Sequence, residues 1–250
     1  MPESQQNNPR PTVLVITADR GVGHGLVKAF CYRGWRVIAT VAPGTFGVPW
    51  VQSLKVERNG GKLMEMDYND EDDMKKVSTD IAGQDTYRLD VVVNCAGLEA
   101  PPAYSGCMYE GEPGVLERIK VMVAVPIVIT KVFTPHLTEA EDGLVPRTLV
   151  HVMPNLQTGA GNYKTLSGQP EVHCHGMAKR SVHAQAQNLD HTYRGRGTRV
   201  NTLLLEAAGP NEGLPFWRSC DSMVRIIETM TPERSGTFLN WEGNPASYYM

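Results

Sequence analysis

The sequence lacks the features that mark a membrane protein, a secreted protein or a nucleic-acid-binding protein. None of its apolar runs reaches the roughly 20 residues of a membrane-spanning helix. Residues 1–11, MPESQQNNPRP, are polar and do not contain the apolar segment of a secretory signal. The formal net charge is only −3, which gives no basis for binding nucleic acid or an anionic membrane. We therefore expect neither a nucleic-acid partner nor a membrane partner.

Cysteine is also scarce. The chain has five cysteines among 250 residues, an odd number at scattered positions: Cys31, Cys95, Cys107, Cys174 and Cys220. This pattern is typical of reduced thiols in a cytosolic protein and not of a disulfide framework. Together with the polar start, it predicts a cytoplasmic protein in which residues 1–11 form a flexible arm.

What the sequence does contain is a regular alternation of apolar, strand-like runs with helix-like segments. Strands are expected at 13–17, 36–41, 62–67, 89–97, 147–153, 198–206 and 235–243. Helices are expected at 24–34, from about Asp70, at 113–137, at 172–194 and between the last two strands. This alternation predicts an α/β fold: a single Rossmann-type, doubly wound parallel sheet of about seven strands, with helices on both faces, formed by residues 12–250.

The most informative stretch joins the first strand to the first helix. It is VITADRGVGHGL, residues 15–26, and it contains Gly21, Gly23 and Gly25. Glycines at this place allow backbone N–H groups and the helix N-terminus to approach a pyrophosphate closely. Glycines also serve ordinary strand-to-helix turns, so this motif alone leaves both interpretations open.

Several motifs together resemble the short-chain dehydrogenase/reductase family over about residues 12–245. TADRGVG is similar to the family's TGxxxGxG but lacks the glycine expected after Thr17. NCAG matches its NNAG, GTRVN matches its GIRVN, and Asp67 stands for its adenine-contacting aspartate. The resemblance implies a nucleotide site formed by Thr17, Arg20, Gly21, Val22, Gly23, Asp67, Asn94, Ala96, Gly97 and Lys179.

The preference between the two nicotinamide dinucleotides is predicted from charge. An NAD site has an acidic residue at the end of the second strand, which binds the ribose 2′-hydroxyl. Here that strand ends with Thr40, Val41 and Ala42. Arg20, beside the glycines, is suited to a 2′-phosphate, although a solvated surface arginine is the alternative. We expect NADP(H) as the cofactor.

The resemblance also locates the family's catalytic Asn, Ser, Tyr and Lys, of which only the lysine is present. HGMAK stands where the family has YxxxK, so His175 replaces the tyrosine and Lys179 is retained. Met122 replaces the asparagine, and Met153 or Pro154 replaces the serine. In the family this lysine also binds the nicotinamide ribose, so its presence supports cofactor binding more than carbonyl chemistry. His175 and Lys179 remain catalytic candidates.

Two carboxylates are further candidates. Glu206 ends the sixth strand, where it could hold a cationic substrate, and Glu171 is the weaker second candidate. Loops that would overhang a pocket for a bulky apolar ligand carry Tyr104, Tyr109 and Trp217. We expect no metal site, because the alternate residues of HCH at 173–175 do not share a helix face.

The loss of the family's Ser and Tyr is similar to some fungal members, as is the tail segment SGTFLNWEG. Those members are bifunctional NADPH-dependent reductases and Diels–Alderases of indole-alkaloid biosynthesis. The resemblance implies an iminium reductase or a cyclase of secondary metabolism. An iminium carbon accepts hydride without a proton donor, and a cycloaddition needs only a shaped apolar pocket that orients its substrate.

Two alternatives stay open: a carbonyl or enone reductase with His175 as the acid, and a non-catalytic NADP-binding protein. The family analogy also implies a homo-oligomer, a dimer or tetramer, in which the helices at 113–137 and 172–194 pair between copies.

Overall fold

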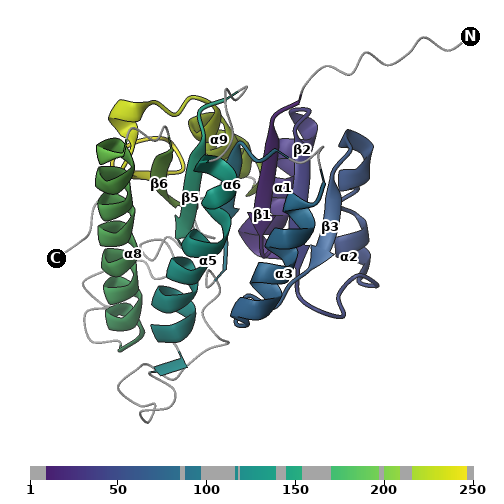
Figure 1. Cartoon of the computed structure of the whole chain (residues 1–250), viewed down its shortest axis with the longest axis horizontal. Helices are drawn as coiled ribbons and strands as arrows, with labels where there is room; N and C mark the ends of the chain where they lie inside the picture. Colours follow the sequence, from purple (N-terminus) through teal and green to yellow (C-terminus); the bar gives the residue numbers. More distant parts are fainter. Residues whose placement is uncertain are drawn as a thin grey trace, which may run out of the picture.

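A parallel sheet of seven strands forms the centre of the fold (Figure 1). The computed structural model describes residues 10–84, 88–96, 116–117, 119–138, 145–153, 170–196, 200–208 and 216–246, and only the backbone of 170–179. The strands are β1 (Thr12–Ile16), β2 (Arg36–Val41), β3 (Lys62–Glu65), β4 (Val91–Asn94), β5 (Thr148–Met153), β6 (Asn201–Glu206) and β7 (Thr237–Asn240).

The strand order is β3-β2-β1-β4-β5-β6-β7, and every neighbouring pair is parallel. The order reverses between β1 and β4, so the chain winds outward in both directions from the centre of the sheet. In such sheets ligands bind outside the carboxyl ends of the strands at this switch point. The predicted doubly wound α/β fold is confirmed.

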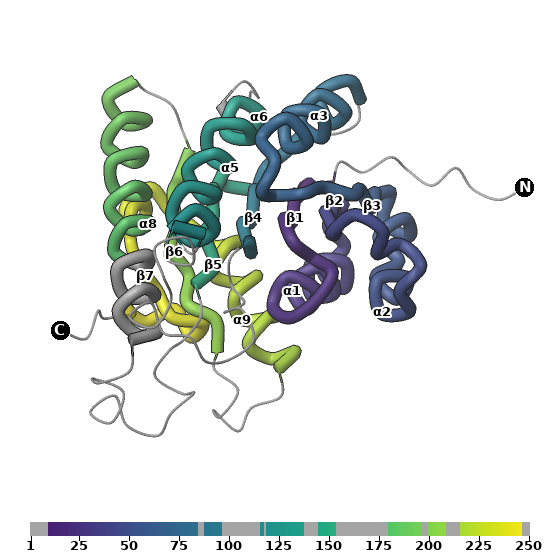
Figure 2. The backbone as a smooth tube through the Cα atoms, turned by 90° about the horizontal axis from the view of Figure 1, so that it is seen from below, coloured from purple at the N-terminus to yellow at the C-terminus, as the bar shows by residue number. Residues whose placement is uncertain are grey.

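Helices cover both faces of the sheet. The helical segments are α1 (Gly21–Tyr32), α2 (Pro49–Gln52), η1 (Val56–Asn59), α3 (Glu71–Ala82), η2 (Lys120–Ala124), α5 (Val125–Phe133), α6 (Pro135–Thr138), α8 (Pro170–Gly195), α9 (Phe216–Glu228) and η3 (Pro232–Arg234). Figure 2 shows α3, α5 and α8 on one side of the sheet and α1 and α9 on the other. Among the described residues, no helix has both the length and the apolarity needed to cross a membrane.

The apolar core is divided by the sheet into two layers. Successive side chains of a strand point to opposite faces, and β1 shows this directly. Val13 and Val15 belong to the cluster that includes residues of α1 and α9, whereas Leu14 and Ile16 pack with residues of α3 and α5. Because both faces are covered, the central strands are continuously apolar, as is typical of buried parallel sheets.

The long helix expected over 113–137 is present in its described part, but it is not regular. In its described part, a π-helical turn (η2) precedes α5, and α6 is a separate short helix. Pro126 has no N–H to donate to the carbonyl four residues earlier, and Pro135 repeats this defect at the start of α6. The two prolines therefore account for the irregular hydrogen bonding at both ends of α5.

Candidate functional site

The turn after β1 is held tightly against β2. The N–H of Thr17 donates to Thr40 Oγ1 at 3.2 Å, and the N–H of Ala18 donates to the Thr40 carbonyl at 2.8 Å. Thr17 was expected to end the first strand, but it lies beyond β1 with a φ of 64°. A β-branched residue in this left-handed region is strained by about 1–2 kcal/mol. A glycine would adopt this φ without cost, whereas the β-branched Thr17 does not.

Glycine is required where the turn enters α1. A Cβ atom on Gly23 would lie 2.0 Å from the Thr17 carbonyl oxygen, and Gly21 has a φ of 52°. The N-cap residue of α1, Arg20, makes no side-chain capping hydrogen bond, and the first turn contains no acidic residue. The N–H groups of this turn are therefore uncapped by side chains, as an anion-binding helix N-terminus requires.

Gly25 has a different role from the one expected. A Cβ atom there would lie 2.5 Å from Cys220 Sγ and 2.7 Å from Phe216 Cε1. Both residues belong to α9. Gly25 therefore allows α9 to pack closely on α1 and does not provide the approach to a ligand.

Charged side chains gather beside the carboxyl end of β2. Arg20 is more than half exposed, and its Nε lies 3.6 Å from Oδ2 of the buried Asp19. Asp67 is exposed in the turn after β3, where its Oδ1 accepts a hydrogen bond from the Asn69 N–H at 2.8 Å. Burial raises the pKa of Tyr68; the charge of Arg20 opposes this shift, whereas Asp67 and Asp19 add to it. These charged side chains therefore influence one another. Val22, in the first turn of α1, packs against the apolar core.

Asn94 links the switch point of the sheet to the interior. Its Oδ1 accepts a hydrogen bond from the Ala96 N–H at 2.9 Å, and its Nδ2 donates to His151 Nδ1 at 3.1 Å. Asn94 is paired in register with Ile16 of β1 and with His151 of β5. The side chain is therefore fixed at the point where the strand order reverses. Gly97, expected beside it, lies outside the described residues.

His151 is a buried polar residue that sequence reasoning missed. Its Nε2 lies 3.3 Å from Thr130 Oγ1, which donates its own proton to the Pro126 carbonyl at 2.8 Å. The imidazole therefore carries its proton on Nε2 and accepts from Asn94 through Nδ1. Burial lowers the pKa of His151 to about 4, so the ring is neutral at pH 7. The only signal in the sequence was a histidine within an apolar strand.

Glu206 is buried at the carboxyl edge of the sheet. It ends β6, is 6% exposed, and is paired in register with Met153 of β5 and Asn240 of β7. Its side chain is therefore largely shielded from solvent. Met153 is also buried, and Met122 is half-buried within the π-helical turn. Trp217, in α9, is exposed.

The catalytic candidates of α8 are placed only by their backbone. His175 and Lys179 lie within this helix, as does Glu171, and their side chains are outside the described part of the chain. Tyr104, Tyr109 and Pro154 also lie outside it. In the parts that are described, no three or more His, Cys, Asp or Glu side chains are grouped so as to hold a metal ion.

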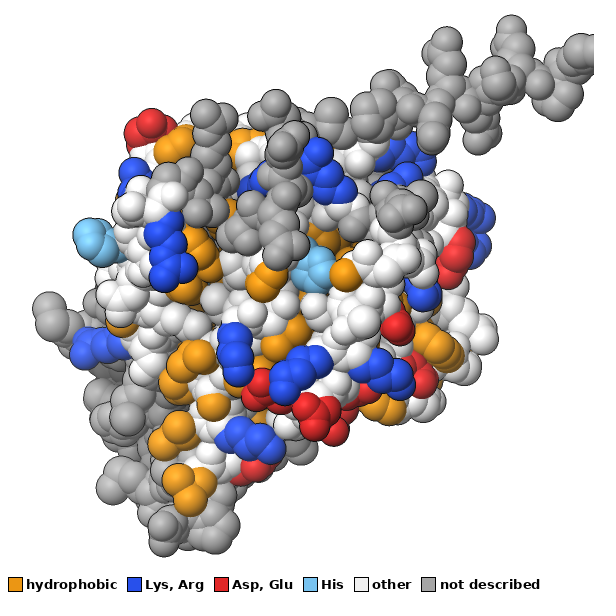
Figure 3. Space-filling model, in the orientation of Figure 1, with side chains coloured by type: hydrophobic (Ala, Val, Ile, Leu, Met, Phe, Trp, Pro, Cys, Tyr) orange, Lys and Arg blue, Asp and Glu red, His pale blue; other side chains and the backbone are white. Residues whose placement is uncertain are grey.

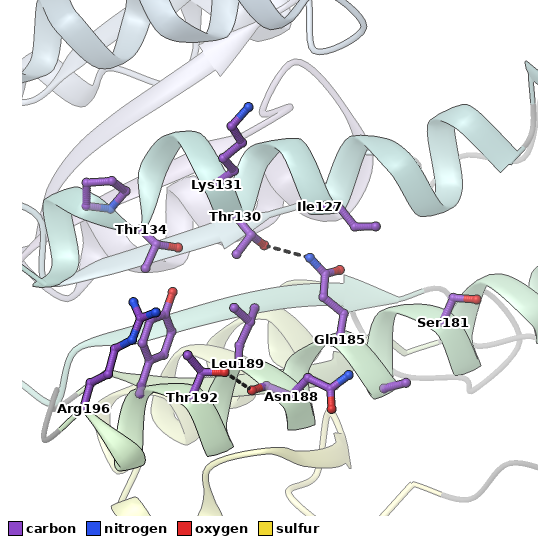
Figure 4. Close-up of a pocket in the computed structure, with 13 residues that line it drawn as sticks. Ile127, Thr130, Lys131, Thr134, Ser181, Gln185, Asn188, Leu189, Thr192 and Arg196 are labelled. Atoms are coloured by element: carbon purple, nitrogen blue, oxygen red, sulfur yellow. Dashed lines mark hydrogen bonds between the residues drawn. The ribbon is translucent and has the colours of Figure 1, made fainter.

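A groove of about 670 Å³ lies between α5 and α8 (Figure 4). Thr130 of α5 faces Gln185 of α8 across it, and Gln185 Nε2 donates to Thr130 Oγ1 at 3.4 Å. The face that carries α3, α5 and α8 shows apolar side chains between charges of both signs (Figure 3). The groove lies on this helical face and is lined by helix residues, so it is distinct from the turn at the end of β1.

Comparison with known proteins agrees with this arrangement. A family model described as short chain dehydrogenase matches residues 11–207. L-fucose dehydrogenase of Oryctolagus cuniculus is 25% identical over 212 residues; the alignment covers 85% of this chain and 66%, less than two thirds, of that protein.

Two solved structures share the fold. Carbonyl reductase Sniffer of D. melanogaster has a TM-score of 0.79 at 20% identity, covering 96% of this chain and 100% of the other. An NADPH-bound carbonyl reductase from chicken fatty liver has a TM-score of 0.75 at 17% identity, covering 96% and 100%. With the family model matching most of its length, the chain belongs to the short-chain dehydrogenase family of oxidoreductases.

Proposed function

We propose that the chain binds NADP(H) at the carboxyl edge of the sheet and uses it to reduce a bulky, apolar substrate that already carries positive charge. The turn between β1 and α1 fits a dinucleotide, because Gly23 leaves no room for a Cβ and the α1 N-terminus lacks a side-chain cap. Arg20 offers a guanidinium for a 2′-phosphate, and β2 ends without a carboxylate. The structurally similar chicken enzyme is described as NADPH-bound.

The remaining cofactor residues have separate roles in this proposal. Asp67 would contact the adenine, Asn94 and Ala96 would adjoin the dinucleotide at the switch point, and Lys179 would bind the nicotinamide ribose. Thr17 and Val22 support the turn itself. When bound, NADPH supplies a hydride, while the side chains of this chain bind and orient the substrate.

The single observation that carries the substrate class is the burial of Glu206 beside Met153. A cation placed in an apolar pocket without a counter-charge would be costly to desolvate. Glu206 supplies that charge at the edge where the substrate would lie. An iminium group needs no proton donor when its carbon accepts hydride, which agrees with methionines at positions 122 and 153 where the family has polar catalytic groups.

Within this proposal, a cycloaddition is the second reaction that such a pocket could promote, as in the fungal alkaloid enzymes that the sequence resembles. It would depend on shape and orientation and not on an acid. The competing candidate is a carbonyl reductase with His175 as the acid, which the similarity in fold to two carbonyl reductases favours. A homo-oligomer formed through α5 and α8 completes the proposal, supported by the exposed Ile127 in the groove between these helices.

Nucleotide titration tests the cofactor proposal. NADPH and NADH are titrated separately into the wild type and Arg20→Ala, with nicotinamide fluorescence as the readout. We expect tighter binding of NADPH by the wild type and loss of that preference in Arg20→Ala. Arg58→Ala, which removes an exposed arginine of η1, is the matched control. Equal affinities in the wild type, or an unchanged preference in Arg20→Ala, would contradict the proposal.

A further inference from the structure

Asp19 is a buried acid within the turn between β1 and α1. The residue is only 7% exposed, and its Oδ1 is buried without a hydrogen-bond partner in the described structure. Its Oδ2 lies 3.6 Å from Arg20 Nε, which is longer than a hydrogen bond. Buried carboxylate oxygens normally accept hydrogen bonds, because an unsatisfied acceptor is costly. Asp19 therefore has the character of an acceptor for a ligand's hydroxyl group.

The position of Asp19 identifies which part of a dinucleotide it would meet. The Ala18 N–H, directly before it, donates to the Thr40 carbonyl near the end of β2. The Met66 N–H, directly after β3, donates to the Val41 carbonyl at 2.9 Å, so the segments that leave β1 and β3 both adjoin this end of β2. In doubly wound sheets, the acid that binds the adenosine ribose stands at the end of the second strand. Here β2 has none, and Asp19 approaches the same place from the neighbouring turn.

We propose that Asp19 substitutes for the ribose-binding carboxylate that β2 lacks: it accepts a hydrogen bond from an adenosine-ribose hydroxyl and opposes the 2′-phosphate that Arg20 attracts. This inference rests on the proposed function, namely that a nicotinamide dinucleotide binds at this turn. Asp19 and a 2′-phosphate compete for the same guanidinium, and like charges at short range repel. The preference of the wild type for NADPH is thus reduced by Asp19 without being abolished.

The test removes the charge of Asp19 and keeps its shape. Dissociation constants for NADPH and NADH, and for the fragments 2′,5′-ADP and 5′-ADP, are measured in the wild type and in Asp19→Asn. We expect the preference for the 2′-phosphorylated ligand of each pair to rise about tenfold in Asp19→Asn. Asp72→Asn, which removes a highly exposed carboxylate of α3, is the control for a general change of charge and should change the preference less than about twofold.

The possible outcomes distinguish a failure of this inference from a failure of the proposed function. If both pairs of ligands bind and Asp19→Asn leaves the preference unchanged, Asp19 has no part in specificity and this inference fails while the proposed function stands. If the wild type binds none of the four ligands, the proposed function fails first. Thermal unfolding monitors the fold of each variant. If Asp19→Asn does not fold, Asp19→Ser takes its place, and an unchanged preference there overturns the inference equally.

Discussion

Glu206 and Met153 are paired residues at the carboxyl ends of neighbouring strands, and both side chains are buried. A carboxylate therefore lies beside an apolar thioether at the edge of the sheet where the substrate of a doubly wound enzyme would bind. Glu206 provides a carboxyl group at this edge, whereas Met153 has no hydroxyl group that could donate a hydrogen bond to the substrate. This combination suits a substrate that needs a counter-ion more than one that needs a proton.

Replacing Gly23 with alanine should disrupt the turn between β1 and α1. The new Cβ would lie 2.0 Å from the Thr17 carbonyl oxygen, so the backbone must shift. We expect a loss of about 1–3 kcal/mol in the free energy of unfolding, measured by urea denaturation, together with weaker nucleotide binding. Gly47→Ala is the control, because a Cβ at Gly47 has no neighbour within 4 Å. Equal stability of the two variants would show that the turn tolerates the added atom.

Acid should destabilise the fold through His151. Burial lowers its pKa to about 4 from an ordinary value of 6.5, so the unfolded chain binds more protons between these pH values. Stability contributed by the neutral ring is complete above pH 6.5 and decreases as pH falls toward 4, by up to about 3 kcal/mol. Protonation would also place a proton on Nδ1, facing the Asn94 amide that now donates to it.

The measurement is the free energy of unfolding against pH for the wild type and for His151→Asn. His24 and His183 also have lowered pKa values because of burial, and they contribute in the same direction in both proteins. The difference between the two curves isolates His151. It should vary between pH 4 and 6.5 and be level above that range, whereas a constant difference across the range would contradict the assignment.

The chain should form a homo-oligomer in which α5 and α8 pair between copies. Ile127 is nearly half exposed and lines the groove between these helices. We expect light scattering at micromolar concentration to give a dimer or tetramer for the wild type and a smaller species for Ile127→Asp. Tyr32→Asp, at an exposed residue at the end of α1, should leave the mass unchanged. A monomeric wild type is the result that contradicts this proposal.

The sheet could be predicted from the sequence because continuous apolar runs mark buried parallel strands. The ends of the elements were less predictable. Thr17 directly follows the apolar run of β1, and a β-branched residue there is typical of a strand, but its φ of 64° places it in the turn. Pro126 and Pro135 were visible signals for the interruption of a long helix, and their effect on hydrogen bonding explains the observed division.

Only those site residues that lie at or directly after the ends of strands could be predicted from the sequence. Arg20, Asn94 and Glu206 lie at the carboxyl edge because their strands are parallel. The buried Asp19 lies in a turn that hydrogen bonds to Thr40 of β2, a contact that no local sequence pattern shows. The network of His151 likewise joins β4, β5 and α5, so no local pattern could reveal it.

Transfer of a labelled hydride tests the central claim most directly. The wild type, His175→Phe and Glu206→Gln are mixed with NADPH deuterated at C4 of the nicotinamide, in single turnover with a bulky cyclic iminium or with the corresponding ketone. We predict deuterium in the reduced iminium, a loss of less than about tenfold in rate for His175→Phe, and a loss of about 10² or more for Glu206→Gln. Deuterium found only in the alcohol, with His175→Phe inactive and Glu206→Gln nearly normal, would contradict the account.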